Sequence, residues 1–265
     1  MSSVNSAGMT NPTGGLIYFF IITAIYSVFN YNSKKTPDKP SSSIYFSIYM
    51  MMVIIGELFI NISLTAGTCG SPQYSTAIIS TILPWGFMFG ILTLLLSIFP
   101  GWLAPFSNTF GYGITLLAGL TNTINDILEP NPDGAKASPD NEFMQQALAH
   151  IYSDKSMLIN EITPSNFDYF WTHMKGIFQK GVFENKELKD KLYSLVQLKY
   201  SVATFVWYML AGLLVTSVSF NYIVNSACGI SAAEMKKRHK QYEEEMDADH
   251  KKNIDSKPRI YSSTE

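Results

Sequence analysis

The sequence has few of the residues from which metal and nucleotide sites are built. It contains two cysteines and four histidines, and it has no HExxH, no Cys-x-x-Cys and no Gly-rich phosphate loop. Such patterns bring metal or phosphate ligands together at a fixed spacing, so a zinc or nucleotide site has no support here. We therefore expect no catalytic residue, no metal, no cofactor and no enzymatic activity.

Charge is also scarce. Charged residues make up 15% of the chain, the net charge is −2, and no extended basic face with interleaved aromatics is present. Proteins that bind nucleic acid neutralise its phosphates with clustered Lys and Arg side chains. The sequence thus gives no reason to expect nucleic acid as a partner.

The chain does contain long apolar blocks, although its mean hydropathy is only +0.09. A helix of about 20 uncharged residues spans the roughly 30 Å hydrocarbon core of a bilayer. The blocks 76–99, 44–66 and 201–224 satisfy this length, whereas 16–29 and 106–121 are shorter. We predict an all-α protein, a multi-span helical membrane protein with about five transmembrane helices and a small helical extramembrane domain.

These blocks divide the chain into five predicted parts. They are a flexible N-terminal leader over 1–15, a four-span transmembrane region over 16–121, a helical extramembrane domain over 122–200, a fifth transmembrane helix over 201–224 and a charged C-terminal tail over 225–265. In the third block, Pro84 and Gly86 are expected to bend the helix. From Glu184 onward, an amphipathic pattern without Gly or Pro runs into the fifth span, which predicts one long helix leaving the membrane.

Two basic clusters suggest an orientation. Cytoplasmic loops carry an excess of Lys and Arg, so both clusters are expected on the cytoplasmic side. That arrangement requires 106–121 to cross the bilayer, giving five crossings with the N-terminus outside; a re-entrant segment is the alternative. Five crossings would place Cys69 and Cys228 on opposite faces, so no intrachain disulfide is expected. The clusters are Lys34, Lys35 and Lys39 in the first connector, and Lys236, Lys237, Arg238 and Lys240 in the tail, where a partner contact is predicted.

Glu57 lies near the middle of the second span, with Asn61 one turn later on the same helical face. An ionisable group at that depth is costly and faces the bundle interior or water, which makes it a candidate functional group. The alternative is that Glu57 and Asn61 only fix helix packing. Packing is favoured, because no acid or base in another span completes a relay.

Aromatic residues in the extramembrane domain recur at helical spacing after Thr163 and Pro164, which predict a helix start there. The stripe includes Phe167, Trp171 and Phe178. Such a stripe is more typical of a core or a partner contact than of a cofactor site.

The pentapeptide 109–113 resembles the selectivity filter of potassium channels, in which backbone carbonyls replace the hydration shell of the ion. It departs from that pattern at Phe110, and Pro100 and Pro105 occupy the place of the required pore helix. The alternative, which we favour, is that Gly111 and Gly113 allow close helix packing.

The whole segment 99–112 resembles membrane proteins of large nucleocytoplasmic icosahedral DNA viruses, including algal viruses. The family-like residues are Pro100, Gly101, Trp102, Pro105, Ser107, Asn108, Thr109 and Gly111. The resemblance covers only about residues 76–121, and it implies a minor capsid or internal membrane protein of the virion, located in the internal membrane beneath the capsid. Its expected partners are the lipid bilayer and capsid or other virion membrane proteins. An ion channel or transporter, and an accessory subunit of a cellular membrane complex, are the alternative functions.

Overall fold

The computed structural model describes residues 12–34, 43–128, 152–226, 228–229 and 232–255. These residues are predominantly helical, and their only β pairing is an isolated bridge between Leu128 and Phe178. The chain forms two units, 1–225 and 226–265. The all-α prediction is confirmed.

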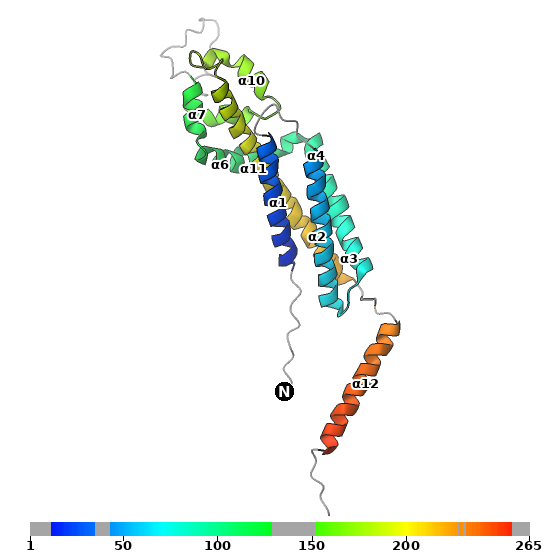
Figure 1. Cartoon of the computed structure of the whole chain (residues 1–265). Coiled ribbons are helices and arrows are strands. Elements are labelled where there is room, and N and C mark those ends of the chain that lie inside the picture. Colours follow the sequence, from blue (N-terminus) through cyan, green and yellow to red (C-terminus); the bar gives the residue numbers. More distant parts are fainter. Residues whose placement is uncertain (1–11, 35–42, 129–151, 227, 230–231, 256–265) are drawn as a thin grey trace, which may run out of the picture. The chain divides into compact units, whose positions relative to one another are not determined.

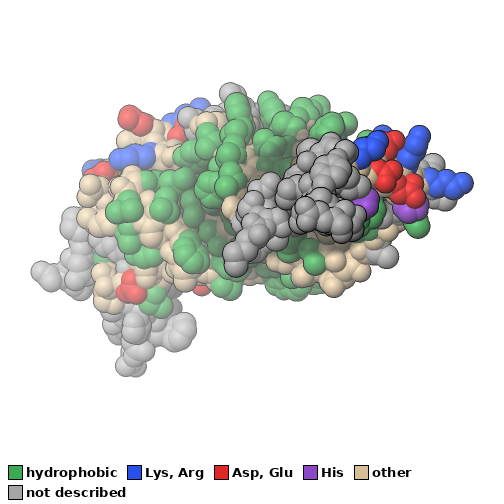
Figure 2. Space-filling view, turned by 90° about the horizontal axis from the view of Figure 1, so that it is seen from below, with side chains coloured by type: hydrophobic (Ala, Val, Ile, Leu, Met, Phe, Trp, Pro, Cys, Tyr) green, Lys and Arg blue, Asp and Glu red, His purple; other side chains and the backbone are tan. Residues whose placement is uncertain are grey.

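Four helices in the described part of the chain are long and apolar enough to cross a membrane (Figure 1). They are α1 (Thr13–Lys34), α2 (Ser43–Cys69), the run Tyr74–Ile98 and α11 (Lys186–Asn225). Many of their large hydrophobic side chains are exposed, for example Phe59 at 68% and Phe87 at 66%. Figure 2 likewise shows hydrophobic side chains over much of the visible surface. A surface of this kind is suited to lipid.

The third span changes its helical hydrogen bonding at Pro84. It consists of α3 (Tyr74–Thr81), a π-helical segment η1 (Ile82–Met88) and α4 (Phe89–Ile98). Proline lacks an N–H and clashes with the preceding turn of an α-helix. At this proline the helix is π-helical, and the Phe89 N–H donates to the Pro84 carbonyl five residues earlier. The apolar run therefore continues through the proline.

The prediction that 106–121 spans the membrane is wrong. The chain from Pro100 to Ile127 is broken into short pieces: η2 (Pro100–Leu103), α5 (Ala104–Phe106), η3 (Ser107–Gly111), α6 (Tyr112–Leu117) and α7 (Leu120–Ile127). Gly119 separates the last two in a left-handed conformation with φ of 97°. Although helical turns run from Pro100 to Leu117, this run is not among the helices that are long and apolar enough to cross a bilayer. The described residues therefore contain four candidate spans rather than five.

Two contacts fix the direction of the spans. The Tyr31 hydroxyl of α1 donates to the Ser194 carbonyl of α11 at 3.5 Å, and Asn61 of α2 donates to Ser219 of α11 at 3.1 Å. The last turns of α1 thus lie beside the first half of α11, whereas the last turns of α2 lie beside its final turns. The C-terminal ends of α1 and α11 therefore lie at opposite ends of the bundle. The prediction that both basic clusters lie on one side depended on a fifth crossing, which the described residues do not contain.

Both cysteines, Cys69 and Cys228, are disulfide-bonded, so neither thiol is free. The expectation that they do not form a disulfide is wrong, because it rested on five crossings, whereas the described residues contain four candidate spans. With four spans, α2 ends at Cys69 at the same end of the bundle at which α11 ends.

The interior of the bundle is aromatic. Phe19, Tyr49, Trp85 and Phe89 are fully buried, and Tyr208 is 6% exposed. Phe19 lies 4.9 Å from Trp85 and 5.6 Å from Phe89 between ring centroids, and Tyr49 stacks on Tyr208 at 6.0 Å. These rings come from α1, α2, the third span and α11, so one aromatic cluster joins all four spans.

The extramembrane domain, here called the head, consists of α7, α9 (Lys155–Glu161), α10 (Phe167–His173), η4 (Lys175–Ile177) and the first half of α11. Its helix α10 begins three residues after the predicted Pro164 start, and the stretch 129–151 lies outside the described residues. Phe167, Trp171 and Phe178 are buried, which confirms that the aromatic stripe belongs to a core. That core is completed by residues of α7 and α11: Leu120, Ile124, Ile127, Leu192, Leu195 and Val196.

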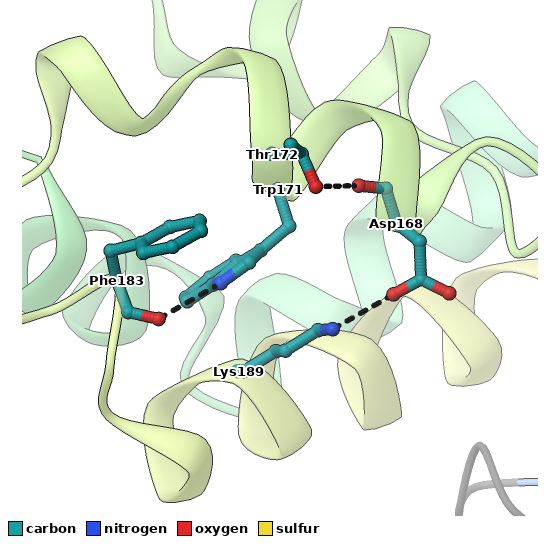
Figure 3. A network of polar contacts seen from close by, with 5 residues as sticks. All are labelled: Asp168, Trp171, Thr172, Phe183 and Lys189. Atoms are coloured by element: carbon teal, nitrogen blue, oxygen red, sulfur yellow. Dashed lines mark hydrogen bonds and ion pairs between the residues drawn. The ribbon is translucent and has the colours of Figure 1, made fainter.

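Figure 3 shows polar contacts of α10 at the edge of this core, of which the ion pair between Asp168 and Lys189 joins α10 to α11. The Lys189 amine lies 2.8 Å from the Asp168 carboxylate, and the Trp171 indole N–H donates to the Phe183 carbonyl at 3.3 Å. The Thr172 hydroxyl donates to the carbonyl of Asp168 at 2.9 Å. Because the Asp168 side chain is 81% exposed, its ion pair adds little stability, and the buried rings carry most of the attachment.

The long helix predicted from Glu184 into the fifth span is confirmed. α11 contains 40 residues without a break, which corresponds to about 60 Å at 1.5 Å per residue. Its first half packs in the head and its second half packs in the bundle. The second unit contains α12 (Ala232–Asp255), a highly charged helix of 24 residues.

Candidate functional site

The two intramembrane residues singled out from the sequence lie in a polar layer inside the bundle. Asn61 is 2% exposed, and its side-chain amide donates to the Thr81 hydroxyl at 2.9 Å and to the Ser219 hydroxyl at 3.1 Å. These three residues belong to α2, α3 and α11. Since water is absent from a bilayer core, the network satisfies polar groups that would otherwise be costly to bury.

Glu57 lies one helical turn from Asn61 and is also 2% exposed. A Cβ atom added at Gly15 would lie 3.0 Å from its Oε2, so α1 packs directly against the carboxyl group. Its Oε1 has no hydrogen-bond partner. Two other polar atoms, Trp85 Nε1 and Thr216 Oγ1, are likewise buried without a partner. Trp85 lies about one turn from Thr81, and Thr216 lies about one turn from Ser219. A second polar layer therefore lies beside the first, with unused donors and acceptors.

The sequence identified Glu57 and Asn61 but not their partners. Thr81, Ser219, Thr216 and Trp85 are single polar residues within apolar runs. Their positions become informative only once the helix directions are known, because they are far apart along the chain. The residues could have been found by looking for Ser, Thr and Trp residues at matching depths in different spans.

The family-like segment forms the turn between the third span and the head. Phe99 and Trp102 stack at 5.4 Å, and the Trp102 ring lies 6.1 Å from Trp207 of α11. Trp102 is 46% exposed, as expected for an interfacial tryptophan. Within the segment, Pro100, Gly101, Trp102, Pro105 and Thr109 are exposed, Asn108 is half-buried, and Ser107 and Gly111 are buried.

Gly111 allows this segment to approach α11 closely. A Cβ atom there would lie only 2.3 Å from the backbone oxygen of Lys199, whereas nothing lies within 4 Å of a Cβ at Gly113. The packing interpretation thus holds for Gly111 and not for Gly113. The pentapeptide is helical, and the Thr109 hydroxyl donates to the Pro105 carbonyl at 2.6 Å. Helical backbone of this kind does not present a ring of free carbonyls to an ion, so the resemblance to a channel filter ends at the sequence.

Lys199 sits where the turn, α11 and the head meet. Its side chain is 1% exposed, and its amine donates to the Ile159 carbonyl at 2.5 Å and to the Asn160 carbonyl at 3.5 Å. These carbonyls end α9, where the helix dipole favours a cation. Lys199 precedes the apolar part of α11, and burial lowers its pKa to about 8, while nearby Glu161 opposes that shift. No pattern in the sequence marks this residue as buried.

The basic residues predicted to contact a partner from the tail lie on α12. Lys236, Lys237 and Lys240 are exposed there, and the side chain of Arg238 lies outside the described residues. His239 lies 3.5 Å from Glu243 on the same helix. No group of three or more potential metal ligands occurs among the residues whose positions are described.

The geometry therefore offers two sites with defined chemistry: the polar layers around Glu57, and the junction of Gly111 with Lys199. No family model, no curated protein and no solved structure matches this chain.

Proposed function

We propose that this chain is a structural membrane protein that holds its head in a fixed position at one face of a bilayer. The observation that carries the proposal is the continuity of α11. Leu192, Leu195 and Val196 on its first half belong to the head core, while Ala203, Tyr208 and Val215 on its second half belong to the bundle core. The head cannot turn relative to the spans without breaking this helix or exposing one of the two cores.

The junction at Lys199 strengthens the same coupling. Its backbone oxygen faces Gly111 of the turn, and its amine binds the end of α9 in the head. A single residue therefore contacts the membrane-proximal turn on one side and the head on the other. A rigid arrangement of this kind favours a protein that positions a surface for assembly over one that moves during a reaction cycle.

The resemblance of segment 99–112 to virion membrane proteins supports a more specific form of the proposal. In that form, the four spans anchor the chain in the internal membrane of a large icosahedral DNA virus. The head contacts the capsid shell, which makes the chain a minor capsid protein. The basic residues of α12 follow the opposite end of α11 and contact a neighbouring virion membrane protein.

This form is tested by photo-crosslinking in purified virions. A photoreactive residue at Tyr169, which is 68% exposed on the head, is expected to give a discrete adduct with one virion protein. The matched control is Phe59, which is equally exposed but lies in the middle of α2, and it is expected to give lipid adducts. The chain should also be present at a fixed stoichiometry and resist extraction by mild detergent. Release as a monomer, with no protein adduct at Tyr169, would contradict the structural proposal.

An ion channel or transporter is the second candidate, and one observation favours it: the unpartnered Oε1 of Glu57 beside two other unpartnered polar atoms. Such groups inside a membrane protein are commonly functional. Reconstituted protein would then show ion flux that Glu57→Gln abolishes and that Thr65→Val, a change in the same helix two turns away, leaves intact. No flux in a reconstitution that conducts with a control channel would exclude this function.

A further inference from the structure

A cavity of about 400 Å³ lies at the head-side end of the spans. Its wall includes the last turns of α1, the first turns of α2, α4 and the middle of α11. Its position is interfacial, because exposed Trp102 follows α4 at the end of the bundle at which the head begins. A cavity of this size falls within the range of small-ligand sites.

Among the described residues that line the cavity there is one lysine and no acidic side chain. Lys34 lines it and is half-buried, and its amine has neither a hydrogen bond nor an ion pair with any described residue. A partly buried cation without a counter-charge is unfavourable, so an anion bound beside it would be stabilising. No Asp or Glu of the described part of the chain lines the cavity, so none there competes with such an anion.

The polar groups of the cavity match an anion that accepts hydrogen bonds. The Thr93 and Ser97 hydroxyls donate to carbonyls of their own helix. Other lining residues carry further donors, among them the Lys34 amine, the Asn30 amide and the hydroxyls of Tyr200 and Ser201. Several donors around one volume suit the oxygens of a phosphate.

One side of the cavity is open to the lipid-facing surface of α4. Leu94 lines the cavity and is 58% exposed, and Gly90 one turn earlier has nothing within 4 Å of a Cβ position. We infer that this cavity binds the phosphate group of an anionic phospholipid, with Lys34 as its counter-ion and the acyl chains following α4 past Gly90 and Leu94. The lipid is the favoured source of the phosphate because the apolar wall continues directly into the bilayer-facing surface.

Lipid binding to the full chain in a neutral detergent tests this inference by native mass spectrometry. Phosphatidylglycerol, phosphatidylcholine with the same acyl chains and inorganic phosphate are titrated separately. One phosphatidylglycerol molecule should bind per chain, in preference to phosphatidylcholine. Lys34→Gln is expected to weaken phosphatidylglycerol binding at least about fivefold, since one interfacial lysine contributes about that factor. The control Lys180→Gln removes the same charge from an exposed site in the head and should change binding less than twofold.

A second pair of variants separates the cavity from non-specific charge attraction. Gly90→Leu and Thr93→Leu fill the cavity and retain Lys34, so both are expected to abolish selective binding while helicity by circular dichroism is unchanged. Equal effects of Lys34→Gln and Lys180→Gln, or undiminished binding to a folded filled variant, would overturn the inference. Inorganic phosphate binding as tightly as phosphatidylglycerol would overturn the assignment to a lipid and identify free phosphate as the ligand.

Discussion

Substitution of Gly111 by alanine tests how the turn packs on α11. The new methyl group would lie 2.3 Å from the backbone oxygen of Lys199 and 3.0 Å from its Cγ. Ordinary contacts between such atoms are about 3.5 Å, so η3 and α11 must separate by roughly 1 Å. The opposing atom belongs to the backbone of a packed helix and cannot rotate away. Overpacking of this kind costs about 1–3 kcal/mol.

Gly113→Ala provides the matched control, because nothing lies within 4 Å of a Cβ there. Both substitutions replace glycine by alanine in a helical segment, and each gains up to about 1 kcal/mol of helix propensity. That gain cancels when the two variants are compared. The difference between them therefore reports the contact with Lys199 alone, about 1–3 kcal/mol in favour of Gly113→Ala.

Thermal unfolding in neutral detergent micelles, followed by circular dichroism, measures this difference. About 2–4 °C per kcal/mol is expected for a chain of this size, with Gly111→Ala unfolding at the lower temperature. Equal midpoints for the two variants would refute the close approach of the turn to α11. A membrane-spanning segment at 106–121 would place neither glycine against Lys199, so the same result would reopen the five-span arrangement.

Three further predictions concern the head and the orientation of the chain. Because the pKa of Lys199 is lowered to about 8 in the folded protein, the unfolded chain binds more protons than the folded chain above that pH. The free energy of unfolding, measured by denaturant titration, should therefore rise between about pH 8 and 10. Lys199→Met should remove that rise. Gln179→Ala removes the amide that donates to the Asn125 and Leu128 carbonyls at 2.8 and 2.9 Å, so it should lower the free energy of unfolding by about 1 kcal/mol, and an unchanged midpoint would contradict this role. A glycosylation acceptor next to Cys69 should be modified in a eukaryotic membrane system, whereas one at Lys180 should not; the reverse pattern would refute the orientation.

Local patterns in the sequence predicted correctly those features that follow from the residues of a single helix. The absence of Gly and Pro from Glu184 to Ala211, with apolar residues on one face, was sufficient to predict the long helix α11. Glu57 and Asn61 were placed correctly inside the bundle for a similar reason. A polar side chain in an apolar helix must face the interior, whichever helices surround it.

The remaining features depend on contacts between distant parts of the chain. The stretch 106–121 carries no charge, and it buries Ser107 and Gly111 against other helices while Phe110 and Leu117 are exposed. Its uncharged composition is therefore the same as that of a spanning helix, although the chain does not continue there as one. Lys199 looked like one more cation on a solvated face, yet α9 covers it and supplies two carbonyls. Neither outcome can be deduced from the length or periodicity of a single segment.

With four spans, charge bias alone no longer decides which face of the membrane carries the head. Lys34 ends α1 at the head side, while the basic residues of the tail follow α11 after it leaves at the other side. Because positive charge follows both ends of the bundle, the excess of Lys and Arg on cytoplasmic loops does not distinguish a cytoplasmic head from a head on the other side. The disulfide at Cys69 separates them, because disulfides persist in oxidising compartments and are rare in the cytosol. The end of the bundle at which α2 and α11 finish is thus expected to face the oxidising side, and the head, with its lysine-lined cavity, the reducing side.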